Sequence, residues 1–561
     1  MGTFNLHRRH VLAGLGAGSA GLLLGNRALP PALDLAYVNA RVWTGYRGVP
    51  LAGAIGLAGE QIATVGAAQT RARIGKRTRV VDLKGGFVCP GFIDNHTHFT
   101  MGSFSLVRVE LLDVKSPQQL VERLGSYAAK QPKGRWILGM GWDSERWGGE
   151  LPTRQLIDAA TPDHPVFINR TDGHVALANS LALRLAGISK DTPDPEGGLL
   201  VRDARGEPTG VVKDNAQTLI ERAIPAATDD ETEAAIRIGI QRALAHGVTQ
   251  VHNMDTDWAT FDAARRLRTK GETDLRFYVM APLNDWEKLA TLIRREGRGD
   301  GWVRWGGLKG MADGALGSRT AYMRRHFLND PKNFGFPLQK WEQFAEWVRQ
   351  ADKAGLQVSA HAIGDAAIDH VLDIFAETAR KNGARDRRFT IEHAQHIALD
   401  AIPRFAKQGV IASIQPFHAI DDGRWAARAI DAEALKGSWA SRSLLDSGAT
   451  VTFGSDWPVA DLDPLGGIEA AVLRRTTDGL QPGGFVPEQR ITAEEALRAY
   501  TAANAYSGFQ ERTLGTLRPG KLADLAILAD NPLSAEPGTI GKIEVLRTVV
   551  NGRERYKASG A

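Results

Sequence analysis

The chain has a single cysteine, Cys89, among 561 residues, which excludes any disulfide within it. It also lacks an uninterrupted apolar run of roughly 18 residues, the length that a membrane-spanning helix requires. Acidic or low-complexity tracts that would indicate disorder are missing as well. The composition, with 43% hydrophobic and 24% charged residues, is typical of a globular protein that buries a large core.

The N-terminal segment differs in character from the rest. In HRRHVLAGLGAGSAGLLLG, Arg8 and Arg9 precede a short apolar segment without acidic residues, which predicts a twin-arginine export signal over residues 1–32. A disordered basic start or a marginal helix is the alternative. We therefore expect a periplasmic or secreted protein with no stable membrane association after signal removal. Removal takes away Arg8, Arg9 and Arg27 and lowers the formal charge from +5 to +2, so we expect no nucleic-acid partner.

The two ends of the mature chain share a pattern of short strands and glycine-containing turns. Residues 34–88 and 509–557 are therefore predicted to form one small β-sandwich domain built from both termini. Between them, apolar strand candidates alternate with helical stretches, which predicts an α/β fold with a (β/α)8 TIM-like barrel over residues 89–508. The first two strands are far apart, so an inserted subdomain is expected at about residues 100–246. The eight strand candidates are FVCPGFIDNH, GVTQVHN, LRFYVMA, VRWGGLKGMAD, LQVSAHAIG, RFTIEHAQ, GVIASIQPF and ATVTFGSDW.

Residues that bind metals or carry charge recur where these strand candidates end. Residues two apart on a strand face the same side, so His96 and His98 can both point to the barrel axis. In a parallel barrel the carboxyl ends of the strands converge on one face. Each residue alone has a structural explanation, such as a hydrogen-bonded histidine or a turn cap, but their common position predicts one metal site. The set is His96, His98, Lys309, His361, His393 and Asp456.

Several motifs resemble those of the amidohydrolase superfamily of metal-dependent hydrolases, over nearly the whole chain after the predicted signal. These motifs are PGFIDNHTH, SAHAIGD, IEHAQ, FGSDWPV and GTLRPGKLADLAIL. More narrowly, RTDGHVALANSLAL and KGMADGALGSRTA resemble the amidohydrolase 3, or YtcJ-like, family, which includes N-substituted formamide deformylases.

The resemblance implies two divalent metal ions, usually zinc, with manganese, iron or cobalt as alternatives. A single-metal site is known in some members. His96, His98 and Asp456 would bind one ion, and His361 and His393 the second. Lys309 would bridge both as a carbamate, because an ammonium has no acceptor lone pair whereas N-carboxylation supplies two anionic oxygens.

The chemistry implied by the resemblance is hydrolysis of a carbon–nitrogen bond other than a peptide bond. A hydroxide bridging the ions would attack the carbonyl, with Asp456 as general base and then acid. An amide of the N-acyl or N-formyl amine type is the first expectation. A cyclic amidine deaminase, or an esterase, lactonase or carbamate hydrolase, is the alternative. A scaffold protein without activity is a further reading, and the complete ligand set argues against it.

Substrate contacts are expected from the loops and the insertion, on a small-molecule substrate. His174 is predicted to contact the substrate or its oxyanion and so to be catalytic, whereas Trp142 and Trp147 fit either the pocket or the core of the insertion. Outer helices and β-domain edges could also support a homodimer. The predicted substrate-binding residues are Asp143, Asp172, His174, Arg319, Gln415 and His418.

Overall fold

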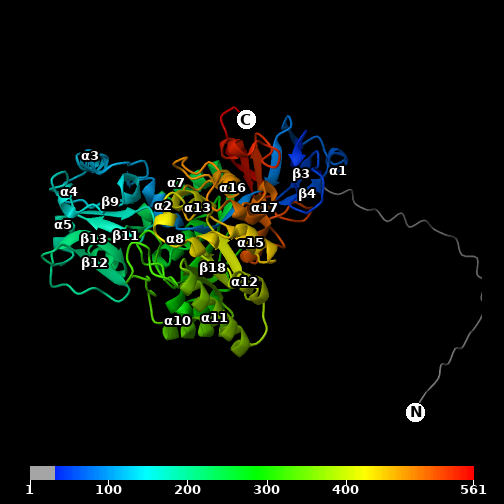
Figure 1. The fold of residues 1–561 in the computed structure, drawn as a ribbon. Coiled ribbons are helices and arrows are strands. Elements are labelled where there is room, and N and C mark those ends of the chain that lie inside the picture. Colours follow the sequence, from blue (N-terminus) through cyan, green and yellow to red (C-terminus); the bar gives the residue numbers. More distant parts are fainter. Residues whose placement is uncertain (1–31, 561) are drawn as a thin grey trace, which may run out of the picture.

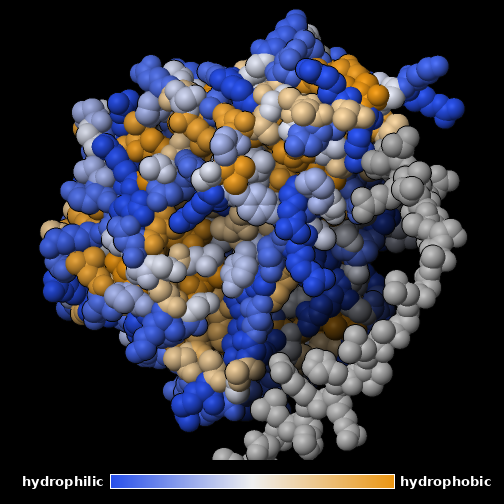
Figure 2. Space-filling view, turned by 90° about the vertical axis from the view of Figure 1, so that its right-hand side faces the viewer, coloured by the Kyte–Doolittle hydropathy of each residue, from blue (hydrophilic) through white to orange (hydrophobic). Residues whose placement is uncertain are grey.

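A computed structural model of the chain describes residues 32–560. The predicted export signal at residues 1–32 therefore lies, except for its last residue, outside the described part. Among the described residues, no helix combines the length and the apolar character needed to cross a membrane. On the face viewed in Figure 2, apolar residues occur in small groups among hydrophilic ones, as is ordinary for a protein surface.

The centre of the molecule is an eight-stranded parallel barrel, in agreement with the predicted fold. Neighbours in the chain order of these strands pair in parallel, and the first strand meets the segment after the last one through a single bridge between Thr97 and Trp457. The barrel is therefore nearly closed. Its strands are β7 (Phe92–Thr97), β14 (Val248–Asn253), β15 (Arg276–Pro282), β16 (Val303–Met311), β17 (Gln357–Ala362), β18 (Thr390–His393), β19 (Ile411–Ile414) and β20 (Val451–Phe453).

Helices cover the outside of the barrel (Figure 1). Their ends follow local signals: Thr228 and Glu231 form a capping box at the start of α7, and Gly271 ends α8 in the left-handed conformation. The helices that follow the strands, or lie at the end of the barrel, are α7 (Asp229–Ala245), α8 (Trp258–Lys270), α9 (Trp286–Glu296), α10 (Trp341–Lys353), α11 (Asp365–Asn382), α12 (Ile402–Gln408), α13 (Pro416–Asp422), α14 (Ala432–Lys436), α15 (Ser441–Asp446), α16 (Pro464–Leu473), α17 (Ala493–Arg498) and α18 (Asn504–Ser507).

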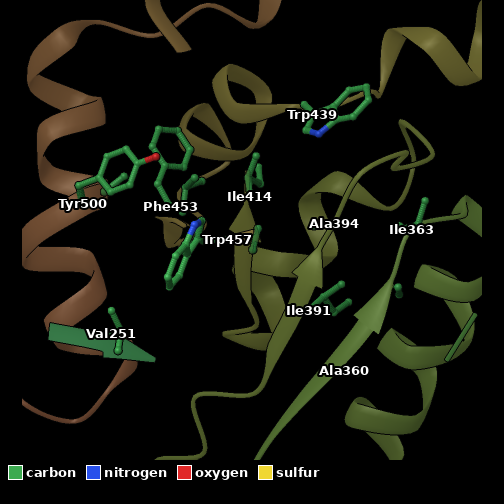
Figure 3. Close-up of a cluster of buried hydrophobic side chains, with 14 of the residues drawn as sticks. Val251, Ala360, Ile363, Ile391, Ala394, Ile414, Trp439, Phe453, Trp457 and Tyr500 are labelled. Carbon is green, nitrogen blue, oxygen red and sulfur yellow. The ribbon is translucent and has the colours of Figure 1, made fainter. Parts of the chain in front are cut away.

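One large apolar core lies between the strands and these helices. Figure 3 shows part of it, with Phe453 on β20 beside Tyr500, which follows α17; their ring centroids are 5.5 Å apart. Ala360 and Ile391 come from the neighbouring strands β17 and β18. This packing holds the strand ends in fixed positions, which the metal-binding side chains then share.

The terminal segments pack into one small domain of two sheets, with the C-terminal strands beside the N-terminal ones (Figure 1). A shared apolar cluster joins Tyr37 and Ile55 of the first sheet to Leu525 and Val549 of the second. The first sheet has the order β4 (Gln61–Val65), β3 (Ile55–Ala58), β1 (Leu35–Val38), β5 (Arg79–Asp82), with α1 (Ala67–Arg71) beside it. The second has the order β2 (Arg41–Val42), β6 (Phe87–Pro90), β21 (Leu525–Leu528), β22 (Val545–Val550), β23 (Arg553–Lys557).

The first predicted strand, FVCPGFIDNH, is in fact two strands. Its start is β6 of the terminal domain, and only the part after Gly91 is the barrel strand β7. A side chain at Gly91 would come within 2.2 Å of Thr249, so glycine is required where the chain passes between the domains. The sequence shows one continuous apolar run here because both strands are fully buried.

The expected insertion is a six-stranded sheet with helices, seen on the left of Figure 1. Its strands occupy residues 109–214, while α2 (Phe99–Ser105) and α7 at the edges of the predicted range pack on each other beside the barrel. Trp142 and Trp147 stack within the apolar core of this subdomain. The sheet order is β12 (Gly198–Arg202), β13 (Pro208–Asp214), β11 (Val175–Ala178), β10 (Val166–Arg170), β9 (Ile137–Trp142), β8 (Val109–Glu110), with helices α3 (Pro117–Ala128), α4 (Arg154–Asp158), α5 (Ser180–Leu185) and α6 (Thr218–Glu221).

Candidate metal centre

A cavity of about 830 Å³ opens at the carboxyl ends of the barrel strands. Both the barrel and the inserted subdomain line it, so its inner end and its outer walls come from different parts of the chain. The side chains at the barrel end are His98, Lys309, His361, His393, His418 and Asp456, and those from the insertion include Leu138, Phe167, Asp172 and His174.

The seam where the barrel closes brings His96 and Asp456 together. The backbone N–H of Asp456 donates to the carbonyl of His96 at 2.7 Å, and the N–H of His98 donates to the carbonyl of Trp457 at 2.8 Å. The buried carboxylate of Asp94 accepts hydrogen bonds from the backbone N–H groups of His96 and Ser455. These bonds fix the ends of β7 and β20 against each other, although 360 residues of sequence separate His96 from Asp456.

The carboxylate of Asp456 lies at the centre of the histidines. Its Oδ1 is 3.3 Å from Nε2 of His96 and 3.4 Å from Nε2 of His98. Its Oδ2 is 3.9 Å both from Nδ1 of His393 and from Nε2 of His418. Two groups with ligand atoms close enough to hold an ion therefore share Asp456: His96 with His98, and His393 with His418.

His361 is expected to share the second ion with His393, with Lys309 bridging both ions. It belongs to neither of the two groups above, and its Nε2 lies 3.1 Å from the carbonyl oxygen of Gly314. Its ring lies 4.5 Å from the ring of His393, centroid to centroid. His418, predicted only as a substrate contact, lies nearer to Asp456 than His361 does, with its Nε2 3.9 Å from Oδ2 of Asp456.

Each predicted histidine ligand has one ring nitrogen held by a polar group behind it. This arrangement fixes the ring orientation and the tautomer, and is the usual support of a metal-binding histidine. The pairs are His96 Nδ1 with Glu392 Oε2 (2.7 Å), His98 Nδ1 with Asp255 Oδ1 (3.3 Å), His361 Nε2 with the Gly314 carbonyl (3.1 Å) and His393 Nδ1 with Gln415 Oε1 (2.9 Å).

The protonation of the centre reflects its burial. Burial by itself would raise the pKa of Asp456, but the neighbouring imidazoles of His96 and His393 hold it well below its usual range. Burial lowers the pKa values of His361 and His393 well below the ordinary histidine value. Asp456 is thus ionised and the rings of His361 and His393 are neutral, as metal ligands require, whereas Asp456 and Glu392 raise the pKa of His96 despite its burial.

Lys309 is buried, with its Nζ 3.3 Å from Nε2 of His96. Burial lowers the pKa of its ammonium. Within residues 32–560, no carboxylate lies within ion-pair distance of this Nζ, but Oδ1 of Asp456 lies 3.3 Å from the same Nε2 of His96. Lys309 and Asp456 therefore both approach one ring nitrogen of His96.

The backbone at the centre is strained at two of these residues. His393 has a φ of 72° and Asp456 a φ of 61°, both in the left-handed region that residues with a Cβ rarely adopt. Such strain costs about 1–3 kcal/mol per residue and persists at functional sites where the surrounding structure imposes it. His393 is the last residue of the buried strand β18, and Asp456 lies three residues after the buried strand β20, so both are constrained by the packed barrel.

Four of the predicted substrate contacts line the cavity: Asp143, Asp172, His174 and His418. Asp172 forms an ion pair with Arg170, and Asp143 accepts a hydrogen bond of 3.2 Å from Arg424. Nδ1 of His174 lies 2.6 Å from Oδ1 of Asp214, and its ring is 5.3 Å from that of His361.

The remaining two predicted contacts lie outside the cavity walls. Gln415 is fully buried behind His393 and binds its ring nitrogen. Arg319 donates to the carbonyl of Leu316 and lies over the ring of Trp425, so its guanidinium already has partners in the protein.

Sequence reasoning missed the acidic partners of the histidines: Glu392, Asp255 and Asp214. Glu392 directly precedes His393 on a fully buried strand, and an acid on such a strand is a signal that could have been used. Asp255 and Asp214 give no comparable signal, because their relation to His98 and His174 arises only from strand pairing.

Comparison with known proteins agrees with this geometry. The sequence profile of the amidohydrolase family matches residues 79–556. The protein LONG AFTER FAR-RED 3 of Arabidopsis thaliana is 36% identical, over 94% of this chain and 93% of its own length. The putative amidohydrolase YtcJ of Bacillus subtilis is 30% identical (86% and 91%), and the N-substituted formamide deformylase of Arthrobacter pascens is 28% identical (94% and 99%).

A solved structure resembles the whole fold. An uncharacterised metal-dependent hydrolase from Pyrococcus furiosus superposes with a TM-score of 0.71 at 30% identity, and the match covers 89% of this chain and 100% of that one. The predicted YtcJ-like resemblance and the barrel fold are therefore confirmed.

Proposed function

This chain belongs to the amidohydrolase family and is a metal-dependent hydrolytic enzyme, and on that premise we propose that it hydrolyses an N-acyl or N-formyl amine. The observation that carries the proposal is the shared carboxylate of Asp456 between two histidine groups at the end of a large cavity. The 28% identity with an N-substituted formamide deformylase, over nearly the full length of both chains, supports an amide as the substrate.

The residues present fit divalent metal ions. Oδ1 of Asp456 and Nε2 of His418 are buried without a hydrogen-bond partner, a costly arrangement that a cation would relieve. Imidazole and carboxylate ligands suit zinc best, with manganese, iron and cobalt as alternatives. We assign one ion to His96, His98 and Asp456 and, as the family resemblance implies, the second to His361 and His393, with His418 close to His393 and Asp456. When bound, such ions lower the pKa of water to about 7 and polarise a carbonyl oxygen.

We further propose that Lys309 carries a carboxyl group on its Nζ. The support is the burial of Lys309 and the contact of its Nζ, which forms no ion pair among the described residues, with Nε2 of His96. A carbamate would turn Lys309 into an acceptor with two anionic oxygens.

Asp456 is placed to move the proton of the reaction. Its carboxylate faces the cavity, and the neighbouring imidazoles keep it ionised, so it can accept a proton from the attacking water. The same carboxyl group then returns that proton to the departing nitrogen. Water thus adds to the carbonyl carbon, the carbon–nitrogen bond breaks, and a carboxylic acid and an amine leave.

His174 is placed to contact the carbonyl side of the substrate. It reaches the cavity from the insertion, next to His361, while Asp214 holds its Nδ1. A histidine oriented by a carboxylate presents its other nitrogen in a fixed direction. His174 therefore orients the carbonyl or stabilises its oxyanion, and Asp214 is a positioning residue.

The test is a hydrolysis panel with zinc-loaded protein. It contains N-formyl amines, N-acetyl amines, matched esters, lactones, carbamates and cyclic amidines. The proposal expects the highest kcat/KM for an N-formyl or N-acyl amine. A higher value for an ester or a cyclic amidine assigns the alternative chemistry of the same centre, and a metal-loaded protein inert to the whole panel contradicts the proposal.

A further inference from the structure

Helix α2 lies between the metal centre and Arg108. His98 precedes the helix, Met101 and Ser105 lie on it, and Arg108 follows its last residue by three; all four line the cavity. Figure 1 shows α2 between the inserted sheet and the barrel. At 1.5 Å per residue, the seven residues of α2 alone correspond to about 10 Å.

Arg108 has no anionic partner in the part of the chain that the structure describes. No hydrogen bond or ion pair is formed by its guanidinium, which lies 4.3 Å above the ring of Phe104. The side chain is only partly exposed, and burial lowers its pKa, with Tyr127 and Glu231 countering this only at longer range. The other cationic side chains along the cavity are engaged: Arg170 pairs with Asp172, and Lys309 belongs to the metal centre.

The cavity wall is mixed in character, with carboxylates such as Asp143 and Asp172 among apolar side chains. The apolar part includes Met101, Leu138, Met140, Phe167 and Ile224. An elongated apolar ligand therefore fits between the metal centre and Arg108. A partly buried guanidinium without a carboxylate is costly, and a planar anion that accepts two of its hydrogen bonds would offset that cost.

We infer that the substrate is an elongated amide whose far end carries a carboxylate, and that Arg108 binds this carboxylate. The inference rests on the proposed function, because the scissile carbonyl must lie at the metal centre. Glu221 also lines the cavity, but it is exposed to solvent and forms no ion pair with Arg108. A substrate that used Glu221 would instead carry an ammonium group, so this is an outcome that the test separates.

The experiment uses the full chain loaded with zinc and pairs of matched substrates. N-formyl-ω-amino acids of increasing chain length are compared with N-formyl alkylamines of the same length and with their ω-ammonium and ω-phosphonate analogues. We expect kcat/KM to favour the carboxylate by about 10- to 100-fold, at chain lengths that span at least about 10 Å and not at short ones. Equal preference for the phosphonate would broaden the ligand from carboxylate to anions of both kinds.

Variants connect this preference to Arg108. Arg108→Met keeps the apolar stem, and we expect the ratio of kcat/KM between the acid and the neutral substrate to fall to about one. Arg108→Lys keeps the charge without the planar fork, so an intermediate ratio is expected. Arg123→Met is the matched control, because Arg123 pairs with Asp113 away from the cavity and its loss should leave the ratio unchanged.

The outcomes separate the two proposals. Hydrolysis of amides with equal kcat/KM for acid and neutral members, or a preference that Arg108→Met retains, overturns the assignment of Arg108 alone. Preference for the ammonium series overturns it in favour of Glu221. If no amide is hydrolysed, the proposed function fails. The same acid and neutral pairs are then prepared as esters, and the ratio of kcat/KM between the acid and the neutral ester tests Arg108.

Discussion

Nδ1 of His96 lies 2.7 Å from Oε2 of Glu392, and both side chains are almost completely buried. Burial by itself would raise the pKa of Glu392, but His96 and Lys309 hold it below its usual value, so an ionised carboxylate orients the imidazole. The other nitrogen of His96 then faces Asp456. One residue of β18 thereby sets the direction of a ligand on β7, two strands that are not neighbours in the barrel.

The first prediction concerns this pair. Glu392→Gln should lower the affinity for the bound metal by about 10- to 100-fold, because the carboxylate that fixes the imidazole is lost. Competition with a chromogenic chelator measures the affinity. Glu377→Gln is the matched control, since Glu377 forms an exposed ion pair with Lys381. An unchanged affinity in Glu392→Gln would show that the carboxylate of Glu392 does not support a metal ligand.

Asp456→Asn tests the proton-transfer role. The amide cannot accept a proton, so kcat should fall by about 100- to 10,000-fold. Steady-state kinetics after full zinc loading, verified by elemental analysis, measures this effect apart from metal loss. A loaded variant that keeps wild-type turnover would remove Asp456 from the mechanism. Asp461→Asn is the control, because Asp461 in the following loop forms an exposed ion pair with Arg242. This variant should keep wild-type turnover.

Lys309→Met tests the carbamate. Methionine cannot be carboxylated, so the variant should bind about one metal ion per chain instead of two. Reconstitution of the wild type should also become more complete when bicarbonate is added to carbonate-free buffer, while Lys309→Met should not respond. Metal content by mass spectrometry gives both results. Two ions bound in Lys309→Met would refute the bridging role.

Asp214→Asn tests the support of His174. Without the carboxylate at its Nδ1, the ring loses its fixed orientation, and kcat should fall at least about tenfold. KM should change less, because the apolar walls that hold the substrate remain. Asp214→Glu should restore part of the loss, which a general disturbance of the fold would not allow. Equal kcat in Asp214→Asn and wild type would exclude this positioning role.

The contact between the barrel and the terminal domain gives a prediction on stability. Arg276 on β15 makes two hydrogen bonds with Asp524, at 2.7 and 3.0 Å, and both are buried. Arg276→Met should lower the free energy of unfolding by about 3–5 kcal/mol, because it leaves a buried carboxylate unpaired. Urea denaturation measures the change.

An exposed pair of the same type is the control for this variant. Arg41 and Asp530 form an ion pair at 3.0 Å with both side chains well exposed. Arg41→Met should therefore lower the free energy of unfolding by at most about 1 kcal/mol. If Arg276→Met lowered the free energy of unfolding by no more than this, the stability of the terminal domain would not depend on the buried pair of Arg276 and Asp524.

Local sequence patterns were sufficient for much of the architecture. Alternating apolar strands and helices predict the barrel, because each strand must be buried on both faces and each helix on one. The same patterns place His96, Lys309, His361, His393 and Asp456 at strand ends, which by barrel geometry share one face. The break at Gly91 was not predictable from apolar character, since β6 and β7 are both buried and only their pairing partners differ.

The sequence by itself determined the barrel and the identity of the residues around its centre, because those depend on periodicity and on position along each strand. Only the tertiary structure decided how they are arranged. It set Glu392 behind His96 and Asp214 behind His174, and it turned Gln415 and Arg319 away from the cavity. It also left Arg108 without an ion pair among the described residues, three residues after the end of α2. These relations join residues from separate strands and from the insertion, and only the packing of those elements fixes the distances between them.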